Sequence, residues 1–353
     1  MNESITFYIF AAGLVILASF VANKYKQTFS SEHSKDEYEM VKQYLLNDSP
    51  LYGYNRPKIW IHSKYEINAR KWQNFQSRNS TDLNQPYLYL TIQSIINHCG
   101  NDFHVCLIDD DTFQKLIPTW DIDISSLADP MKSHIRNIGM LELVYYYGGI
   151  VLPNSFLCTR SLIDLYHTNK AFVCENINRY VNILKDKQRT LFIPDIEIMG
   201  APKNCEFVKH FVEYLKREIY NGHFHTENDF LGSKNQFCID QIHQHNIYLV
   251  DGEYIGIKTR HGKQIVLDDL MEDSFLDIDS DKIYGIQIPR DDILRRTKYQ
   301  WFAILPVKDI LESNIILSKF FKVSMVDSAE SILNEKTCTD CIYSIRNKSV
   351  ISI

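Results

Sequence analysis

The stretch Ser133–Leu162, SHIRNIGMLELVYYYGGIVLPNSFLCTRSL, constrains the fold of this chain more than any other. An apolar run at 131–147 with helical spacing ends at Gly148-Gly149, and a short apolar run at 150–152 follows at once. The first glycine can end a helix in a left-handed conformation, and the second lets another backbone segment pass closely. A helix that runs straight into a buried strand is typical of α/β proteins, so this stretch predicts one unit of such a sheet.

Strand-like and helix-like patterns alternate from Pro57 onward. Short apolar runs bounded by polar or turn residues predict buried strands, and longer runs with helical spacing predict helices. This alternation predicts an α/β fold with a largely parallel sheet, whose ligand site lies at the carboxyl ends of the strands. The expected strands are 58–62, 103–108, 150–152, 171–174, 191–193, 247–250 and 283–288, and the expected helices are 87–99, 111–117, 131–147 and 205–220.

Composition narrows the class of protein. Hydrophobic residues make up 45% of the 353 residues and charged residues 23%, which is typical of a globular protein. The formal net charge of −6 argues against a nucleic-acid-binding protein, because such proteins are usually basic. Most of the cysteines lie in apolar stretches, as buried free thiols do, and this favours a reducing compartment. Cys338 and Cys341 form a Cys-x-x-Cys pair without the second pair that a zinc site would need.

The start of the chain has the pattern of a membrane anchor. Ile5–Ala22 carries no charge and would span about 27 Å as a helix, close to the ~30 Å hydrocarbon core of a bilayer. A cleaved signal peptide would begin with basic residues, which the first four positions lack. Lys24 and Lys26 after the span indicate a globular part in the cytosol by the positive-inside rule. The expected order is a tail at 1–4, a single-pass transmembrane anchor at 5–22, a polar stalk at 23–56, a globular domain at 57–323 and a loose tail at 324–353.

Several motifs of the globular part occur together in the order and spacing of a known enzyme family. They are Pro57-Lys-Ile-Trp-Ile-His62, Leu107-Ile-Asp-Asp-Asp111, the Ser133–Leu162 stretch, Ile198-Met-Gly-Ala-Pro-Lys203 and Tyr284-Gly-Ile-Gln-Ile-Pro289. Together they resemble the glycosyltransferases of family 32 and the related capsular polysaccharide synthesis type, over roughly 57–321. The resemblance implies a GT-A fold, a Rossmann-like sheet that binds a nucleotide-diphosphate sugar and passes the sugar to a glycan or protein acceptor.

The chain departs from this family where the family binds a metal. The family places Asp-x-Asp at the end of the strand after the double glycine, where residues i and i+2 share a face and both carboxylates reach one divalent ion. Here those two positions hold Pro153 and Ser155. Proline offers no side-chain ligand, and serine is a poor anchor for a hard cation. The metal-binding motif of the family is therefore lost.

The helix before the double glycine has changed as well. The family's Asp and Arg, one turn apart, correspond to Asn137 and Met140 here, and the serine just after His134 has become Arg136. With acids lost and a cation gained, we expect no divalent metal and no other cofactor besides the donor substrate. Arg136 could then neutralise the charge on a leaving diphosphate through charge-assisted hydrogen bonds.

The resemblance and the strand ends together define a candidate site. Glu197 and Asp229 correspond to acceptor-side positions of the family, so either could be a catalytic base or a hydroxyl contact. In the acidic run Asp109–Asp111 we expect Asp110 or Asp111 to cap the following helix, with the rest facing solvent. The residues expected to bind the nucleotide sugar are Trp60, His62, Ser63, His134, Arg136, Asn137, Gly148, Gly149, Asn154 and Ser155.

Two functions remain open at the level of sequence. The first is a membrane-anchored sugar transferase that works without a metal. The second is a catalytically inactive protein of the same fold that binds a glycan or a partner, or serves as a scaffold. A charge network at Arg136, Asn154 and Ser155 would favour the first, and a pocket filled by Met140 and Pro153 would favour the second.

Overall fold

The computed structural model describes residues 56–63, 85–118, 120–166, 170–178, 192–220 and 227–325, all within one compact unit of the chain. The strands are β1 (Lys58–His62), β2 (His104–Ile108), β3 (Gly149–Pro153), β4 (Phe156–Cys158), β5 (Phe172–Ile177), β6 (Phe192–Ala201), β7 (Tyr248–Val250) and β8 (Gly285–Gln287). The helices are α2 (Tyr87–Cys99), α3 (Asp110–Leu116), α4 (Met131–Tyr147), α5 (Ile163–Tyr166), α6 (Glu206–Tyr220), α7 (Glu227–His243), α8 (Leu267–Met271), α9 (Arg290–Arg295), α10 (Gln300–Ile304), α11 (Val307–Glu312) and α12 (Ile316–Ser324). Short 3-10 turns lie at Ile124–Ser126, Gly252–Ile255 and Thr297–Tyr299.

The main sheet of the described unit has the strand order β2-β1-β3-β6-β5-β7. β1 runs parallel to both β2 and β3, and β5 runs parallel to β7. β6 is antiparallel to both of its neighbours, β3 and β5. The unit is therefore a mixed α/β structure, and within its main sheet three parallel pairings stand beside two antiparallel ones. A separate antiparallel ribbon joins β4 to β8.

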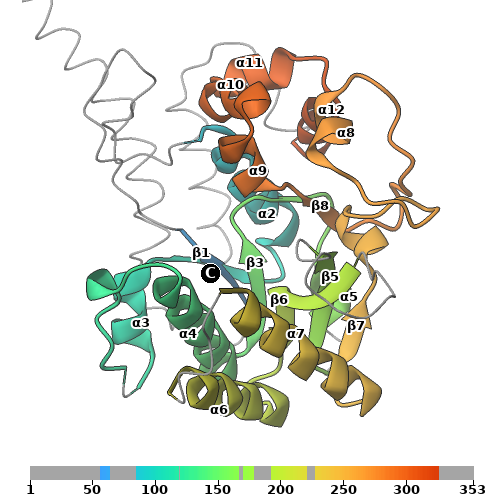
Figure 1. Ribbon diagram of the computed structural model, residues 1–353. Helices are drawn as coiled ribbons and strands as arrows, with labels where there is room; N and C mark the ends of the chain where they lie inside the picture. The colour runs from blue at the N-terminus through green and yellow to red at the C-terminus, as the bar shows by residue number, and fades with distance from the viewer. Residues whose placement is uncertain are drawn as a thin grey trace, which may run out of the picture. The chain divides into compact units, whose positions relative to one another are not determined.

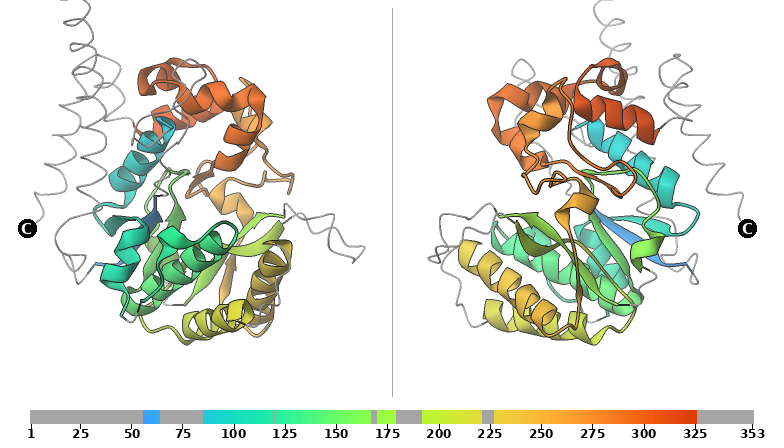
Figure 2. Two further views of the ribbon diagram at one scale, coloured as in Figure 1. Left: turned by 60° about the vertical axis from the view of Figure 1, so that its left-hand side comes forward. Right: turned by 90° about the vertical axis from the view of Figure 1, so that its right-hand side faces the viewer.

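Helices cover the two faces of the main sheet (Figures 1 and 2). α4, α6 and α7 lie on one face, and α2 with the helices α9 to α12 lies beyond the other. The principal core forms between the sheet and the first of these layers, where Val151, Met199, Leu141 and Phe211 belong to one buried cluster. Burial of this apolar surface is the main source of the unit's stability.

The junction of α4 and β3 explains the double glycine. Gly148 ends α4 with φ 70°, and Gly149 follows with φ 117°, a backbone region that favours glycine. A Cβ on Gly149 would lie 2.2 Å from the carbonyl oxygen of Lys58, so a larger residue would push β1 and β3 apart. The indole of Trp60 donates to the carbonyl oxygen of Gly148 at 2.9 Å and ties β1 to the same junction.

The sheet differs from expectation at β6. The sequence predicted a short strand at 191–193 and a largely parallel sheet, but β6 covers Phe192–Ala201 and reverses the strand direction. Alternation of strands and helices along a chain does not report strand direction, because a reversal needs no crossover helix. The strict alternation of Asp195-Ile-Glu-Ile198 is the strand signal that marks the extra length. α7 was not among the expected helices.

The predicted anchor at 5–22 and most of the predicted stalk lie outside the described residues. Within the part of the chain that the structure describes, none of the helices combines the length and the apolar character needed to cross a membrane.

Candidate functional site

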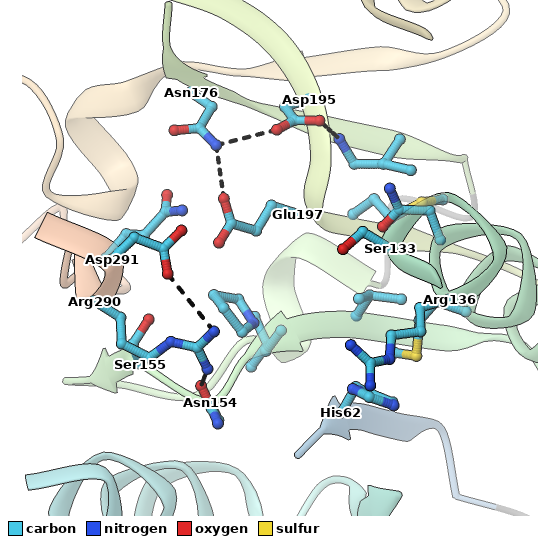
Figure 3. A pocket seen from close by; sticks show the side chains of 18 of the residues that line it. His62, Ser133, Arg136, Asn154, Ser155, Asn176, Asp195, Glu197, Arg290 and Asp291 are labelled. Carbon is cyan, nitrogen blue, oxygen red and sulfur yellow. Dashed lines mark hydrogen bonds and ion pairs between the residues drawn. The ribbon is translucent and has the colours of Figure 1, made fainter. Parts of the chain in front are cut away.

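A pocket of about 280 Å³ opens at the carboxyl ends of β1 and β3. This is the edge at which parallel α/β sheets place their ligands. Its walls come from α4, β3, β6, α7 and the start of α9, and they mix apolar and charged side chains (Figure 3). The polar lining residues are His62, Ser133, Arg136, Asn137, Asn154, Ser155, Asn176, Asp195, Glu197, Lys234, Gln287, Arg290 and Asp291.

The first charged wall is built around Arg136 on α4. Its Nε donates to Asp110 Oδ1 at 2.8 Å and its Nη2 to Asp110 Oδ2 at 2.6 Å, a bidentate pair. His62 Nε2 lies 3.0 Å from Asp110 Oδ1, and its ring stacks on Phe113. Burial acts to raise the pKa of Asp110, but the bonds from Arg136 and His62 outweigh it and hold that pKa well below its usual range.

Asp110 itself is held in place by the start of α3. The neighbouring Asp109 caps that helix, because its carboxylate accepts from the backbone N–H of Thr112 at 3.0 Å. The prediction that Asp110 or Asp111 would be the cap is therefore wrong by one or two positions. Asp110 is thereby left to bind Arg136.

The second charged wall lies at the turn between β3 and β4. Asn154, which is 4% exposed, accepts a hydrogen bond on its Oδ1 from Arg290 Nη1 at 3.0 Å. Its backbone carbonyl oxygen accepts from Thr91 Oγ1 at 2.6 Å. The backbone carbonyl of Ser155 accepts from the N–H of Ile288 at 3.1 Å, which fixes the segment before α9 against this turn.

The third charged wall is the polar face of β6. Asp195 pairs with Lys234 of α7 at 2.5 Å, and the amide nitrogen of Asn176 donates to Asp195 at 3.1 Å and to Glu197 at 2.8 Å. Burial disfavours both ions of the pair. Their mutual attraction outweighs it, so the pKa of Asp195 falls and that of Lys234 rises. In Figure 3 the Glu197 side chain projects between the Arg136 wall and the Arg290 wall.

His134 lies beside this pocket on α4 and is 4% exposed. Burial, reinforced by the positive charge of Lys234, lowers the pKa of His134 to about 4. The imidazole is therefore neutral at pH 7.

The structure brings about half of the predicted residues together. His62, Arg136, Asn137, Asn154, Ser155 and Glu197 line the pocket. Trp60, Ser63, Gly148, Gly149 and His134 do not belong to its lining. Trp60 is fully buried in the core, and Ser63, 2% exposed, donates its backbone N–H to Ile108.

Asp229 lies in the first turns of α7, where the structure describes the backbone alone. Its predicted role on the acceptor side stays a prediction.

Six charged or amide side chains of the pocket were absent from the sequence prediction: Asn176, Asp195, Lys234, Gln287, Arg290 and Asp291. The alternation around Asp195 and Glu197 was a signal for two carboxylates on one strand face. No local signal marks Arg290, because its partner Asn154 lies 136 positions away in the sequence.

The residues at the end of β3 do not fit a divalent metal. Pro153 has no side-chain ligand, Ser155 offers only a hydroxyl, and the Asn154 oxygen between them accepts a hydrogen bond from Arg290. Asp195 and Glu197 have the spacing of a carboxylate pair, but Lys234 already neutralises Asp195. Across the described ranges, no group of three or more His, Cys, Asp and Glu residues is placed to hold a metal ion.

Comparison with known proteins adds little to this picture. No family model matches the chain, and no curated protein matches it either. Among solved structures, a crystal structure of an active-site mutant of LgtC matches with 12% sequence identity and a TM-score of 0.28, over 56% of this chain and 74% of that chain. A similarity at this level assigns neither a fold nor a function to the chain.

Proposed function

We propose that this protein transfers a sugar from a nucleotide-sugar donor to a glycan or protein acceptor, without a bound divalent metal. The observation that supports the proposal best is the open, charged pocket at the carboxyl ends of β1 and β3. This pocket lies directly after the helix-Gly-Gly-strand unit that carries the sequence resemblance.

The size of the pocket limits which part of a donor it holds. Its volume of about 280 Å³ is at the lower end of the ~300–1,000 Å³ range of ligand pockets. This suits a sugar ring with its attached phosphate better than a whole nucleotide sugar. We therefore place the transferred sugar in the pocket and the nucleoside beyond its rim. Amide, hydroxyl and carboxylate groups of the walls supply partners for the sugar hydroxyls.

Glu197 is the proposed general base. Asn176 holds its carboxylate at 2.8 Å and directs it into the pocket. A carboxylate in this position can accept the proton of an acceptor hydroxyl as the hydroxyl oxygen attacks the anomeric carbon. In this proposal a cation of the protein stabilises the charge that builds on the departing diphosphate, which agrees with the poor fit of a divalent metal to the described residues at the end of β3.

An inactive scaffold would be favoured by a pocket that Met140 and Pro153 fill. Both residues line the pocket and leave it open. The described residues therefore do not show the filled pocket that would favour the inactive alternative.

Membrane anchoring is a second part of the proposal and rests on the sequence alone. The uncharged Ile5–Ala22 would hold the protein in a membrane as a single span, with the described unit in the cytosol because Lys24 and Lys26 follow the span. Protease added outside sealed cells should then leave the described unit intact. Digestion from outside would reverse the proposed orientation.

Thermal unfolding of the full-length chain with UDP-, GDP- and CMP-sugars, each with and without Mn²⁺, tests donor binding. A ligand that binds the native state raises its stability by mass action, so a donor near saturation should raise the Tm by about 5 °C. We expect the same rise with and without Mn²⁺. If none of the donors raises the Tm, the proposed function is wrong.

Glu197→Gln separates binding from transfer. This variant should keep its affinity for the donor and lose at least ~100-fold in transfer rate, because general-base catalysis contributes about that much. Glu213→Gln, on the exposed side of α6, is the matched control and should behave as the wild type. Transfer at the wild-type rate in Glu197→Gln would remove Glu197 from the mechanism.

A further inference from the structure

We propose that Arg290, held by Asn154, takes the position and the role of the missing metal and binds the diphosphate of the donor. This inference rests on the proposed sugar transfer and names the group that stabilises its leaving group. The sequence had assigned that role to Arg136.

The position of Arg290 follows from the turn after β3. Asn154 lies between the two positions at which the related enzymes carry their metal-binding acids. Its buried side chain directs Oδ1 toward the Arg290 guanidinium at 3.0 Å. Thr91 donates to the backbone carbonyl of Asn154, and the backbone N–H of Arg290 donates to the carbonyl of Ile288 at 2.8 Å. Both backbones are therefore held at the strand end.

The charge balance of the pocket singles out Arg290 among its cations. Arg136 gives two hydrogen bonds to the Asp110 carboxylate, and Lys234 pairs with Asp195 at 2.5 Å. Arg290 donates to a neutral amide, and the Asp291 carboxylate lies 3.8 Å away, beyond hydrogen-bond distance.

Exposure supports the same distinction. The side chain of Arg290 is 22% exposed, whereas that of Arg136 is 6% exposed. An anion in the pocket can therefore reach the guanidinium of Arg290 without displacing a buried carboxylate partner.

The chemistry of a guanidinium suits this role. It is always charged and presents several N–H donors in one plane, which match two phosphate oxygens at once. Such charge-assisted pairs are about twice as strong as neutral hydrogen bonds. A divalent metal has the same effect in other enzymes, because it neutralises charge that develops on a leaving phosphate.

The transfer step is then balanced without a metal. The acceptor oxygen forms a bond to the anomeric carbon of the sugar, and the bond from that carbon to the phosphate oxygen breaks with its electron pair left on the diphosphate. Glu197 receives the acceptor proton. Arg290 stays protonated throughout and donates hydrogen bonds to the oxygen on which negative charge collects.

Titration calorimetry on the full-length chain in EDTA-containing buffer tests the inference with two probes, inorganic pyrophosphate and the nucleotide sugar found by thermal unfolding. Arg290→Gln should weaken the binding of both probes by about 10- to 100-fold, the usual worth of hydrogen bonds to a charged group. Arg290→Lys keeps the charge without the planar fork and should recover part of the affinity. The matched control is Arg295→Gln on the same helix, exposed and outside the pocket lining, which should bind as the wild type.

The outcomes separate this inference from the proposed function. If the wild type and Arg290→Gln bind equally well, or if a repeat with Mn²⁺ in place of EDTA is needed for binding, the role of Arg290 is wrong while donor binding still supports sugar transfer. If the wild type binds pyrophosphate through Arg290 but no nucleotide sugar, the anion site stands and sugar transfer fails. Binding of neither probe, in EDTA or with Mn²⁺ in its place, overturns both. If Arg290→Gln does not fold, the affinities of the wild type and of Arg290→Lys for the two probes are compared instead. Equal affinities would then contradict the role of the Arg290 guanidinium.

Discussion

Two guanidinium groups face the same pocket and are held in opposite ways. Arg136 lies on α4 and donates two hydrogen bonds to the Asp110 carboxylate, which also bonds to His62. Arg290 enters from α9 and gives its hydrogen bond to the neutral amide of Asn154. The positive charge of Arg136 is balanced by two hydrogen bonds to a carboxylate, whereas the carboxylate of Asp291 lies 3.8 Å from the Arg290 guanidinium.

The difference shows that the residue type alone does not tell whether a charge in a pocket serves a ligand. Breaking a buried ion pair leaves each charge without its partner. Separating Arg136 from Asp110 therefore costs a large part of the stability. Arg290 loses only a bond to an amide if it turns toward an anion. We therefore assign Arg136 to the stability of the pocket and Arg290 to binding, and each of the following measurements can break that division.

The largest expected effect is on stability at the first wall. Arg136→Met should lower the free energy of unfolding by about 3 kcal/mol, because Asp110 keeps its charge in a part-buried place without its main partner. Urea denaturation followed by circular dichroism measures this loss. Arg290→Met is the control, and equal losses in the two variants would contradict the contrast between the walls.

The next prediction concerns His134 on α4 and the pH dependence of the free energy of unfolding. Since burial lowers the pKa of His134 to about 4, the unfolded chain binds more protons than the folded one between pH 6.5 and 4. Stability should be complete above pH 6.5 and fall as the pH drops toward 4, by on the order of 2 kcal/mol from this residue.

His134→Gln isolates that contribution. Burial also lowers the pKa values of His98 and His104, so the wild type has several sources of the same pH dependence. The variant should show a shallower decline of unfolding free energy over this range. An unchanged slope would mean that His134 titrates alike in both states.

Double-mutant cycles compare the two walls directly. Arg136→Met with Asp110→Asn should give a coupling energy of about 1.5 kcal/mol, as expected for a bidentate pair that is mostly buried. Arg290→Met with Asp291→Asn should give less than about 0.5 kcal/mol, because these groups lie 3.8 Å apart near solvent. A larger coupling at the second wall would show that Asp291 already neutralises Arg290.

The smallest expected effect is the stability change in the variant that removes the binding charge. Arg290→Gln should alter the free energy of unfolding by about 0.5 kcal/mol or less, since a neutral hydrogen bond at a part-exposed site contributes little. Arg295→Gln should change it by a similar or smaller amount. A loss above that of Arg136→Met would make Arg290 a structural residue.

Much of the fold could be predicted because its signals are local. The helix predicted at 131–147 is α4, and the strand predicted at 58–62 is β1, with the same bounds. Apolar spacing and a double glycine involve only neighbouring residues, so both patterns can be recognised in a single sequence. The antiparallel placement of β6 could not be predicted, because strand direction depends on how distant segments pair.

The location of the candidate site and about half of its predicted residues could be read from the sequence. The carboxyl ends of β1 and β3 were expected to carry it, and His62, Asn154 and Ser155 line the pocket found there. Lys234 and Arg290 reach the pocket from parts of the chain without any distinguishing pattern.

The sequence by itself determined the α/β pattern, the tight junction at Gly148-Gly149 and the absence of acidic side chains at positions 153 and 155. Only the tertiary structure decided which cation can serve a ligand. Arg136 meets its partner 26 positions away and Arg290 meets its partner 136 positions away. The availability of a charge depends on the partner and the solvent around it, and packing brings these together only once the chain has folded.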